Sequence, residues 1–377
     1  MSVAADHPSR WLLRPAQLRD LAALEALAQA SAIGISSLPS DRDALRQLLA
    51  LSTKAFASDD VASGEELYLF VLEDRAQGGA LVGTSGIAAA AGFNDSFYCY
   101  RNEFIVQASA ELAVRNRIHT LHLCHDLSGV TLLTGFHIDT SLAHTLAPQL
   151  LSRGRLLFIA QFADRFSDRI AAENPGLSNA QGDCPFWDAV GRRFFALDYA
   201  AAERLGGGRS HKGWIAGLMP QSPIYVPLLP AEAQWSLGQL HPVGALPFDI
   251  LLDEGLDGDT YLNLFDGGPT ADGRVALLKT VARRRALAVL PTKHQATRVA
   301  PRAATTRWQL VANGLQPDFR AMLLPAAADD AGGGTAALDL PPAAADALCW
   351  QAGDTLWGAL LDTAPPPLPA GAAASSP

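Results

Sequence analysis

The chain has 377 residues, of which 49% are hydrophobic and 18% are charged, and its formal net charge is −9. This composition supports a large hydrophobic core and excludes global disorder. A net negative charge argues against binding to nucleic acid or to an anionic membrane, and it is compatible with a cationic substrate. At roughly 100–200 residues per domain, the length predicts two domains or one large composite domain.

The four cysteines lie far apart and form no CxxC pair. This spacing favours free thiols in a reducing compartment over a disulfide framework. Residues 1–10 are polar and lack the apolar segment of a signal peptide. The least polar stretch, residues 79–93, is short and rich in alanine and glycine, as expected for a strand and a turn rather than a membrane span. The sequence therefore predicts a soluble, cytoplasmic protein.

The first half of the chain has the patterns of alternating strands and helices. Hydrophobic periodicity predicts a strand, two helices, a hairpin, two further strands and a long helix. Their ranges are 11–14, 18–30, a helix capped by Ser40 or Asp41, 67–73, 80–89, 119–123, 132–138 and 146–164. The aromatic segment 90–102 is expected to be irregular. This order of elements predicts an α+β fold with a mainly antiparallel twisted sheet flanked by helices.

The second half is less regular. It predicts a helix at 186–197, a strand at 261–265 and two late strands at 307–311 and 320–324. We expect four parts in the chain: an N-terminal half, a second half, a small β-rich C-terminal appendage and a disordered tail rich in proline and alanine. Their boundaries are predicted at 11–180, 181–295, 303–361 and 362–377.

Three histidines, His119, His122 and His125, suggest a metal site and a metal-dependent hydrolase. Side chains along a strand alternate between its faces, so His122 would point away from the other two. We therefore expect no metal site. No GxSxG, HExxH, GxxxxGK[ST] or GxGxxG motif occurs between a strand and a helix. Their absence argues against the common hydrolases, nucleoside triphosphatases and dinucleotide-binding enzymes.

Residues 238–242 (GQLHP) place His241 before a proline, which biases the histidine towards an extended, loop-like backbone. A loop histidine with a pKa near ~6.5 can exchange protons at cellular pH. By spacing alone, an ordinary surface or capping histidine is the simpler interpretation. The turn at 265–269 (FDGGP) is likewise interpreted as structural, and the aromatic residues in 185–187 (PFW) as part of the core.

Taken together, several stretches in a fixed order resemble the arginine N-succinyltransferase family from about Trp11 to Leu361. The stretches are FVLED (70–74), YCYRN (98–102), CHDLSG (124–129), SRGR (152–155), PFWDAVG (185–191), GQLHP (238–242) and FDGGPT (265–270). The resemblance implies an acyl-CoA N-acyltransferase (GNAT-like) fold. It also implies transfer of a succinyl group from the co-substrate succinyl-CoA to the α-amine of L-arginine or ornithine, in arginine catabolism.

The same resemblance implies roles for two residues and no permanently bound cofactor. The family's proton donor falls on His241. A residue that contacts succinyl-CoA, on the strand before the long helix, falls on Phe136, where the family pattern has leucine. A backbone contact would survive this change, whereas a side-chain contact that depends on shape would be altered.

Residues 143–148 depart from the family pattern. Acyl-CoA N-acyltransferases hold the CoA pyrophosphate on free backbone N–H groups at a helix N-terminus. Here the sequence AHTLAP replaces an Arg-x-x-Gly-x-Gly pattern, and Pro148 has no N–H group. These losses resemble the alpha branch of two-subunit enzymes and imply an oligomer with a beta subunit. Two functions stay open: a catalytic subunit that acts through His241, and a non-catalytic partner that stabilises or regulates the beta subunit.

Overall fold

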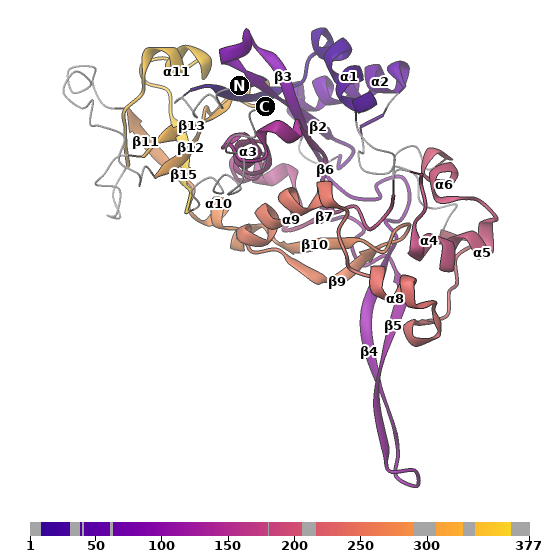
Figure 1. Ribbon diagram of the computed structural model, residues 1–377. Coiled ribbons are helices and arrows are strands. Elements are labelled where there is room, and N and C mark those ends of the chain that lie inside the picture. Colours follow the sequence, from indigo (N-terminus) through magenta and orange to yellow (C-terminus); the bar gives the residue numbers. More distant parts are fainter. Residues whose placement is uncertain are drawn as a thin grey trace, which may run out of the picture.

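The computed structural model describes residues 9–30, 38–39, 41–60, 63–179, 181–205, 216–289, 307–326 and 336–362. The strands of this part of the chain form one twisted sheet, and helices pack on its faces (Figure 1). The strand order is β14-β11-β15-β12-β13-β1-β2-β3-β6-β7-β10-β9-β4-β5-β8. The pairs β6–β7 and β11–β14 are parallel, and the others are antiparallel. The predicted α+β class with a mainly antiparallel sheet is therefore confirmed.

The strands have the following bounds: β1 Trp11–Pro15, β2 Leu67–Asp74, β3 Ala80–Ala88, β4 Cys99–Ser109, β5 Val114–Cys124, β6 Thr131–Ile138, β7 Arg169–Glu173, β8 Ile224–Tyr225, β9 Asp257–Asn263, β10 Pro269–Arg274, β11 Arg285–Val289, β12 Trp308–Ala312, β13 Ala321–Pro325, β14 Ala336–Leu338 and β15 Leu356–Leu360. The α-helices are α1 Leu21–Ala30, α2 Arg42–Ala57, α3 Ala147–Gln161, α4 Pro185–Ala189, α5 Gly191–Phe195, α6 Tyr199–Leu205, α8 Ala231–Ser236, α9 Pro242–Glu254, α10 Lys279–Ala282 and α11 Pro342–Ala347. Short 3-10 turns include η1 Leu18–Asp20, η3 Thr140–Leu142 and η5 Val226–Leu228.

Helix α3 lies at the centre of the largest core cluster, and all its residues from 147 to 160 are buried. The ring of Phe158 packs against Phe70 and Phe319, with centroid distances of 5.3 and 5.1 Å. Gly154 allows the helix to approach β1 closely, because a Cβ atom at this position would lie 2.2 Å from a methyl carbon of Leu13. The predicted helix at 146–164 is thus the element around which the sheet is packed.

A buried ionic network fixes α3 to the following helices. The Arg153 guanidinium of α3 pairs with the carboxylates of Asp253 and Glu254 at the end of α9. Glu254 is fully buried and also accepts hydrogen bonds from the N–H and hydroxyl groups of Thr280 in α10, both at 2.8 Å. Lys279 donates to Asp253 at 2.8 Å. Buried charges are tolerated because each one has ionic or hydrogen-bonding partners.

The local signals in the first half of the chain match the structure closely. Asp41 caps α2, because its carboxylate accepts the Ala44 N–H at 2.8 Å. The predicted hairpin at 67–73 and 80–89 corresponds to β2 and β3. Ser40, the other candidate cap, lies outside the described residues. Capping and strand periodicity are sufficient to predict these elements because tertiary packing favours the same local structure.

The segment expected to be irregular, residues 90–102, contains the start of strand β4 at Cys99. Strands β4 and β5 pair without interruption from Cys99↔Cys124 to Ser109↔Val114, and the hairpin projects from the body of the molecule (Figure 1). Much of β4 is exposed on both faces, so it lacks the apolar alternation of a half-buried strand. The predicted helix at 186–197 is divided at Val190 into α4 and α5.

The sheet contains strands from all three of the predicted folded parts. Strands β4 and β7 of the first part pair with β9 and β10 of the second. Residues 303–361 contribute β12–β15 and α11, which share a smaller core cluster. The division at 11–180, 181–295 and 303–361 stays a prediction. The predicted disordered tail, apart from Asp362, lies outside the described residues.

All four cysteines carry free thiols. Cys99 and Cys124 face one another at the base of the β4–β5 hairpin, with 3.6 Å between their sulfur atoms. In the part of the chain that the structure describes, no helix has both the length and the apolar character needed to cross a membrane.

Replacing Glu254 with glutamine should test the buried network. The change keeps the side-chain shape but leaves Arg153 without its buried anionic partner. We expect the free energy of unfolding, measured in urea, to fall by about 3 kcal/mol. Asp253→Asn is the matched control, because Asp253 is 31% exposed and its loss should cost about 1 kcal/mol or less. Equal losses for the two variants would contradict the assigned role of Glu254.

Candidate functional site

Three loops meet where β7 ends. In the segment after β7, the Pro175 carbonyl accepts a hydrogen bond from the backbone N–H of His241 at 2.8 Å. In the turn between β9 and β10, the Gly267 carbonyl accepts a hydrogen bond from the backbone N–H of Gly238 at 2.9 Å. Two motifs that were considered separately in the sequence, 238–242 and 265–270, are therefore parts of one structure.

Glycine is required where these loops cross. A Cβ atom on Gly268 would lie 2.4 Å from the Gly176 nitrogen and 2.5 Å from the Asn174 carbonyl oxygen. A Cβ atom on Gly176 would lie 2.5 Å from the Asp266 carbonyl oxygen. The obstacles are backbone atoms, which a change of rotamer cannot move. No motif pointed to residues 174–176, although their sequence NPG, just after the strand-like stretch 170–173, is a turn signal.

Aromatic side chains of the core pack against the turn between β9 and β10. The Trp187 ring stacks on Phe265 with 5.6 Å between centroids. Tyr199 donates a hydrogen bond from its hydroxyl to the buried Asp266 carboxylate at 3.3 Å. Phe186 and Trp187 are fully buried in the core cluster under the turn. This confirms the interpretation of the aromatic residues in 185–187 as core.

His241 is the N-cap residue of α9 and is partly buried. Its Nδ1 atom accepts the Val243 N–H at 3.3 Å, which leaves the proton of the neutral ring on Nε2. Burial lowers the pKa of the imidazole below its ordinary value, and the nearby Asp266 carboxylate opposes part of this shift. The lowered pKa favours the neutral ring at cellular pH.

Phe136 lies at a bulge in β6. In the pairing of β3 with β6, Thr84 is opposite His137 and Gly86 is opposite Thr134, so two residues of β6 face one residue of β3. Gly135 has a positive φ of 58° at this point. Such bulges bend a strand and redirect its side chains. The Phe136 ring is partly buried against the main core cluster.

Arg155 of α3 occupies the space beneath the bulge. Its guanidinium donates to the carbonyl oxygens of Gly86 and Thr134, at 3.3 and 3.2 Å, and lies 5.8 Å from the centre of the Phe136 ring. Complete burial lowers the pKa of this guanidinium to about 9. The sequence showed Arg155 only as part of the SRGR stretch and gave no sign of this contact.

The parallel strands β6 and β7 separate after three residue pairs, of which the last is Leu133↔Ala172. Phe136 lies three residues beyond Leu133, and Pro175 lies three residues beyond Ala172. Because Pro175 holds His241, the two predicted site residues lie past the same end of neighbouring strands. Phe136 and His241 thus both lie just beyond the end of the β6–β7 pairing.

The N-terminus of α3 offers few donors for a phosphate. The N–H of Ala147 already donates to the Thr145 hydroxyl at 3.2 Å. Pro148 has no N–H group, and the Leu150 N–H bonds to the Leu146 carbonyl within the helix at 3.1 Å. This helix end therefore lacks the array of free amides that binds pyrophosphate elsewhere.

The three histidines considered for a metal site have other contacts. His119 is hydrogen-bonded to Asn102, and its ring stacks on Phe104. His122 lies 3.5 Å from the Glu103 carboxylate. Within the described ranges, no group of three or more His, Cys, Asp or Glu side chains is arranged to hold a metal ion.

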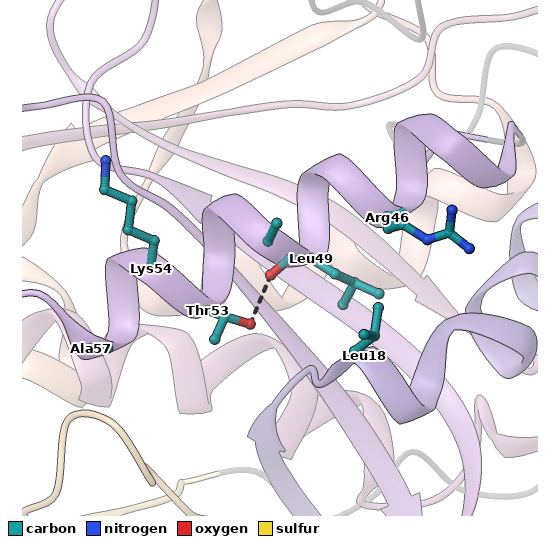
Figure 2. A pocket seen from close by; sticks show the side chains of 7 residues that line it. Leu18, Arg46, Leu49, Thr53, Lys54 and Ala57 are labelled. Atoms are coloured by element: carbon teal, nitrogen blue, oxygen red, sulfur yellow. Dashed lines mark hydrogen bonds between the residues drawn. The ribbon is translucent and has the colours of Figure 1, made fainter.

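Two hollows on the surface of the described residues lie away from His241 and Phe136. The larger, about 510 Å³, lies beside η1 and α2 (Figure 2). It is lined by Leu18, Arg46, Leu49, Ala50, Thr53, Lys54 and Ala57. The smaller, about 290 Å³, lies at α4 and α8 and is lined by Asp183, Pro185, Asp188, Ala189, Arg193, Pro230, Glu232 and Ala233.

Comparison with known proteins relates this architecture to one family. Residues 11–280 match the family model described as arginine N-succinyltransferase beta subunit. A chain named arginine N-succinyltransferase subunit alpha, from Pseudomonas aeruginosa, is 46% identical over 83% of this chain and 90% of its own length. The arginine N-succinyltransferase of Citrobacter koseri is 35% identical over 91% of this chain and 95% of its own.

A solved structure agrees with these sequence matches. The structure titled arginine/ornithine succinyltransferase subunit AI from Pseudomonas aeruginosa superposes with a TM-score of 0.79 and 42% identity. It covers 93% of this chain and 98% of its own. The protein is thus an enzyme of the acyltransferase class. More narrowly, the chain belongs to the arginine N-succinyltransferase family, and the resemblance found in the sequence is confirmed.

The crossing of the loops can be tested with two glycines of strand β10 and its turn. Gly268→Ala should destabilise the protein by about 1–3 kcal/mol and reduce activity, because its methyl group would meet backbone atoms. Gly273→Ala is the control, since a Cβ atom there has its closest contact at 3.6 Å. Urea unfolding and initial rates should separate the two variants. A Gly268→Ala variant with unchanged stability and rate would contradict the close crossing.

Proposed function

We propose that the chain transfers the succinyl group of succinyl-CoA to the α-amine of L-arginine, with ornithine as an alternative acceptor. The observation that carries this proposal is that His241 and Phe136 both lie beyond the same end of the β6–β7 pairing. The membership of the chain in its family supports the choice of reaction. The net charge of −9 is compatible with a cationic amino-acid substrate.

His241 is the group that we propose to move the proton. The α-ammonium group of the acceptor must lose a proton before its nitrogen attacks the thioester carbonyl. A neutral imidazole can accept that proton, and the resulting imidazolium can protonate the departing CoA thiolate. The lowered pKa of His241 favours the neutral ring as the resting form and makes the imidazolium a better acid.

Phe136 is proposed to contact succinyl-CoA where β6 leaves β7. Past Leu133, β6 no longer pairs with β7, so an extended acyl-pantetheine chain could bond to its backbone there. The unit of β6, α3 and β7, in which β6 and β7 are parallel, also supports an acyl-CoA N-acyltransferase (GNAT-like) fold. Arg155 acts as a positioning residue, because it holds the two carbonyls that flank the bulge.

We further propose that the chain works as an alpha subunit beside a beta subunit. The donor-poor N-terminus of α3 is the supporting observation, since it weakens independent binding of the CoA pyrophosphate. The same observation favours a second candidate function. In that case the chain is a non-catalytic partner that stabilises or regulates the beta subunit, and His241 takes no part in the reaction.

Replacing His241 with alanine should lower kcat by about 10²–10⁴-fold in a succinyl-CoA assay with L-arginine. The KM values should change little, because the proposed role is proton transfer. His125→Ala, an exposed histidine after β5, is the matched control and should keep the wild-type rate. The assay should use the chain alone and the chain with its beta partner. Full activity of a pair that carries His241→Ala would instead assign the chain a supporting role.

The pH profile should report the state of His241. If the neutral ring accepts the proton, kcat/KM falls as the pH drops through the pKa of this imidazole. Since burial lowers that pKa, the acid limb should lie below the ordinary histidine value of ~6.5. The limb should disappear from the residual activity of His241→Ala. An unchanged limb in this variant would assign the titration to another group.

Binding of CoA can be measured apart from catalysis. By isothermal titration calorimetry, we expect the chain alone to bind CoA at least about tenfold more weakly than the pair does, because α3 supplies so few N–H donors. Dephospho-CoA and pantetheine are useful controls, since pantetheine lacks the pyrophosphate. Equal CoA affinity of the chain alone and of the pair would show that residues 143–148 are sufficient for binding of the CoA pyrophosphate.

A further inference from the structure

The hairpin of β4 and β5 extends beyond any third strand. Strand β9 pairs with β4 only at residues 99–101, and β8 pairs with β5 only at Thr120 and Leu121. Residues 102–119, which we call the arm, form a two-stranded ribbon that projects from the body (Figure 1). An isolated two-stranded ribbon is only marginally stable in water. A partner that covers the arm would account for its length.

One face of the arm is both cationic and apolar. Directly paired residues lie on the same face of the ribbon. The face in question carries the pairs Phe104↔His119, Val106↔Arg117 and Ala108↔Arg115. The Arg117 guanidinium lies 4.0 Å from the centre of the Phe104 ring. The His119 ring also stacks on Phe104, with 4.8 Å between centroids. Phe104 is 47% exposed and Val106 is 59% exposed. The face thus presents ordered positive charge beside uncovered apolar surface.

A surface of opposite character lies on the body, beside the base of the arm. We call it the acidic patch, and it consists of the smaller hollow with the exposed residues next to it. The hollow has the carboxylates of Asp183, Asp188 and Glu232 against one guanidinium, that of Arg193. Asp188 also pairs with Arg192 outside the hollow, at 3.0 Å. The remaining carboxylates leave the hollow with a negative excess.

Two large exposed apolar side chains belong to the segment 228–235, which also contributes Pro230, Glu232 and Ala233 to this hollow. Trp235 on α8 is 70% exposed, and Leu228 in η5 is 83% exposed. Exposed tryptophan beside a recess is typical of the anchors of protein interfaces. The acidic patch is continuous with the arm base, because η5 directly follows β8, which pairs with β5.

We propose that the arm docks on the acidic patch of a second copy of this chain. Charge complementarity supports a copy as the occupant. Arg115 and Arg117 lie on the face described above, whereas Glu103 pairs with Thr120 on the opposite face, so a cationic face of the arm would meet the negative hollow. An eight-residue strand spans about 26 Å. Two arms laid side by side in opposite directions would therefore bring each tip to the base of the other, where the patch lies.

Such an exchange is a two-fold, self-complementary interface, in which each copy gives one arm and receives one. It needs no substrate and no active-site residue. It is therefore independent of the proposed reaction, and it can be tested by association alone with the full chain.

The test reverses charge on each surface separately. In sedimentation velocity, the wild-type chain should be a dimer. The variant Arg115→Glu/Arg117→Glu and the variant Asp183→Arg/Glu232→Arg should each be monomeric, with the dissociation constant raised about a hundredfold. The control Arg46→Glu/Lys54→Glu reverses the same number of positive charges on α2 and should stay dimeric. Circular dichroism and thermal melting establish that each variant is folded.

Mixing the two monomeric variants gives the decisive result. In a mixed dimer, one contact pairs the reversed arm with the reversed patch, and the other pairs the two original surfaces. Both contacts are then complementary, so the mixture should recover the wild-type dimer. A wild-type monomer, an arm variant that stays dimeric, or a mixture that stays monomeric would each overturn the proposal. Loss of beta-subunit binding by the arm variant, without a change in self-association, would assign the arm to the beta subunit instead.

Discussion

The ionic network at Arg153 is the interaction on which the arrangement of the site depends. Helix α3 is buried along almost its whole length, so a charge in its middle must be compensated inside the protein. The compensation comes from the end of α9, whose first residue follows His241. One buried network therefore links the central helix, the helix that His241 caps, and α10 beyond it.

The segments just past the β6–β7 pairing are fixed differently, by local backbone geometry. The positive φ of Gly135 introduces the bulge, and Arg155 satisfies the carbonyls beside it. Strand β7 then ends in a segment that crosses the turn of Gly268 too closely for any side chain. The bulge and the crossing both lie just past the end of the β6–β7 pairing. Backbone contacts therefore fix the two segments that carry Phe136 and Pro175.

The sequence predicted the elements that have their own local signals. The Asp41 cap, the β2–β3 hairpin and α3 were found because capping, alternation and helical periodicity act over a few residues. Strand β4 was missed because its outer part has no core to impose alternation. For the site, the resemblance to a family pointed to His241 and Phe136. No pattern in the sequence could show that Pro175 holds His241 or that Arg155 lies under Phe136, because these contacts depend on how distant segments meet.

Helix α9 connects two fixed points, and this restricts how its length can vary. Glu254 at one end must face Arg153, and His241 at the other must meet the Pro175 carbonyl. One inserted or deleted residue would rotate one end relative to the other by about 100° and shift it by about 1.5 Å. Substitutions along the exposed side of α9 leave this geometry unchanged. Across relatives, the number of residues in this helix should therefore vary less than their identity.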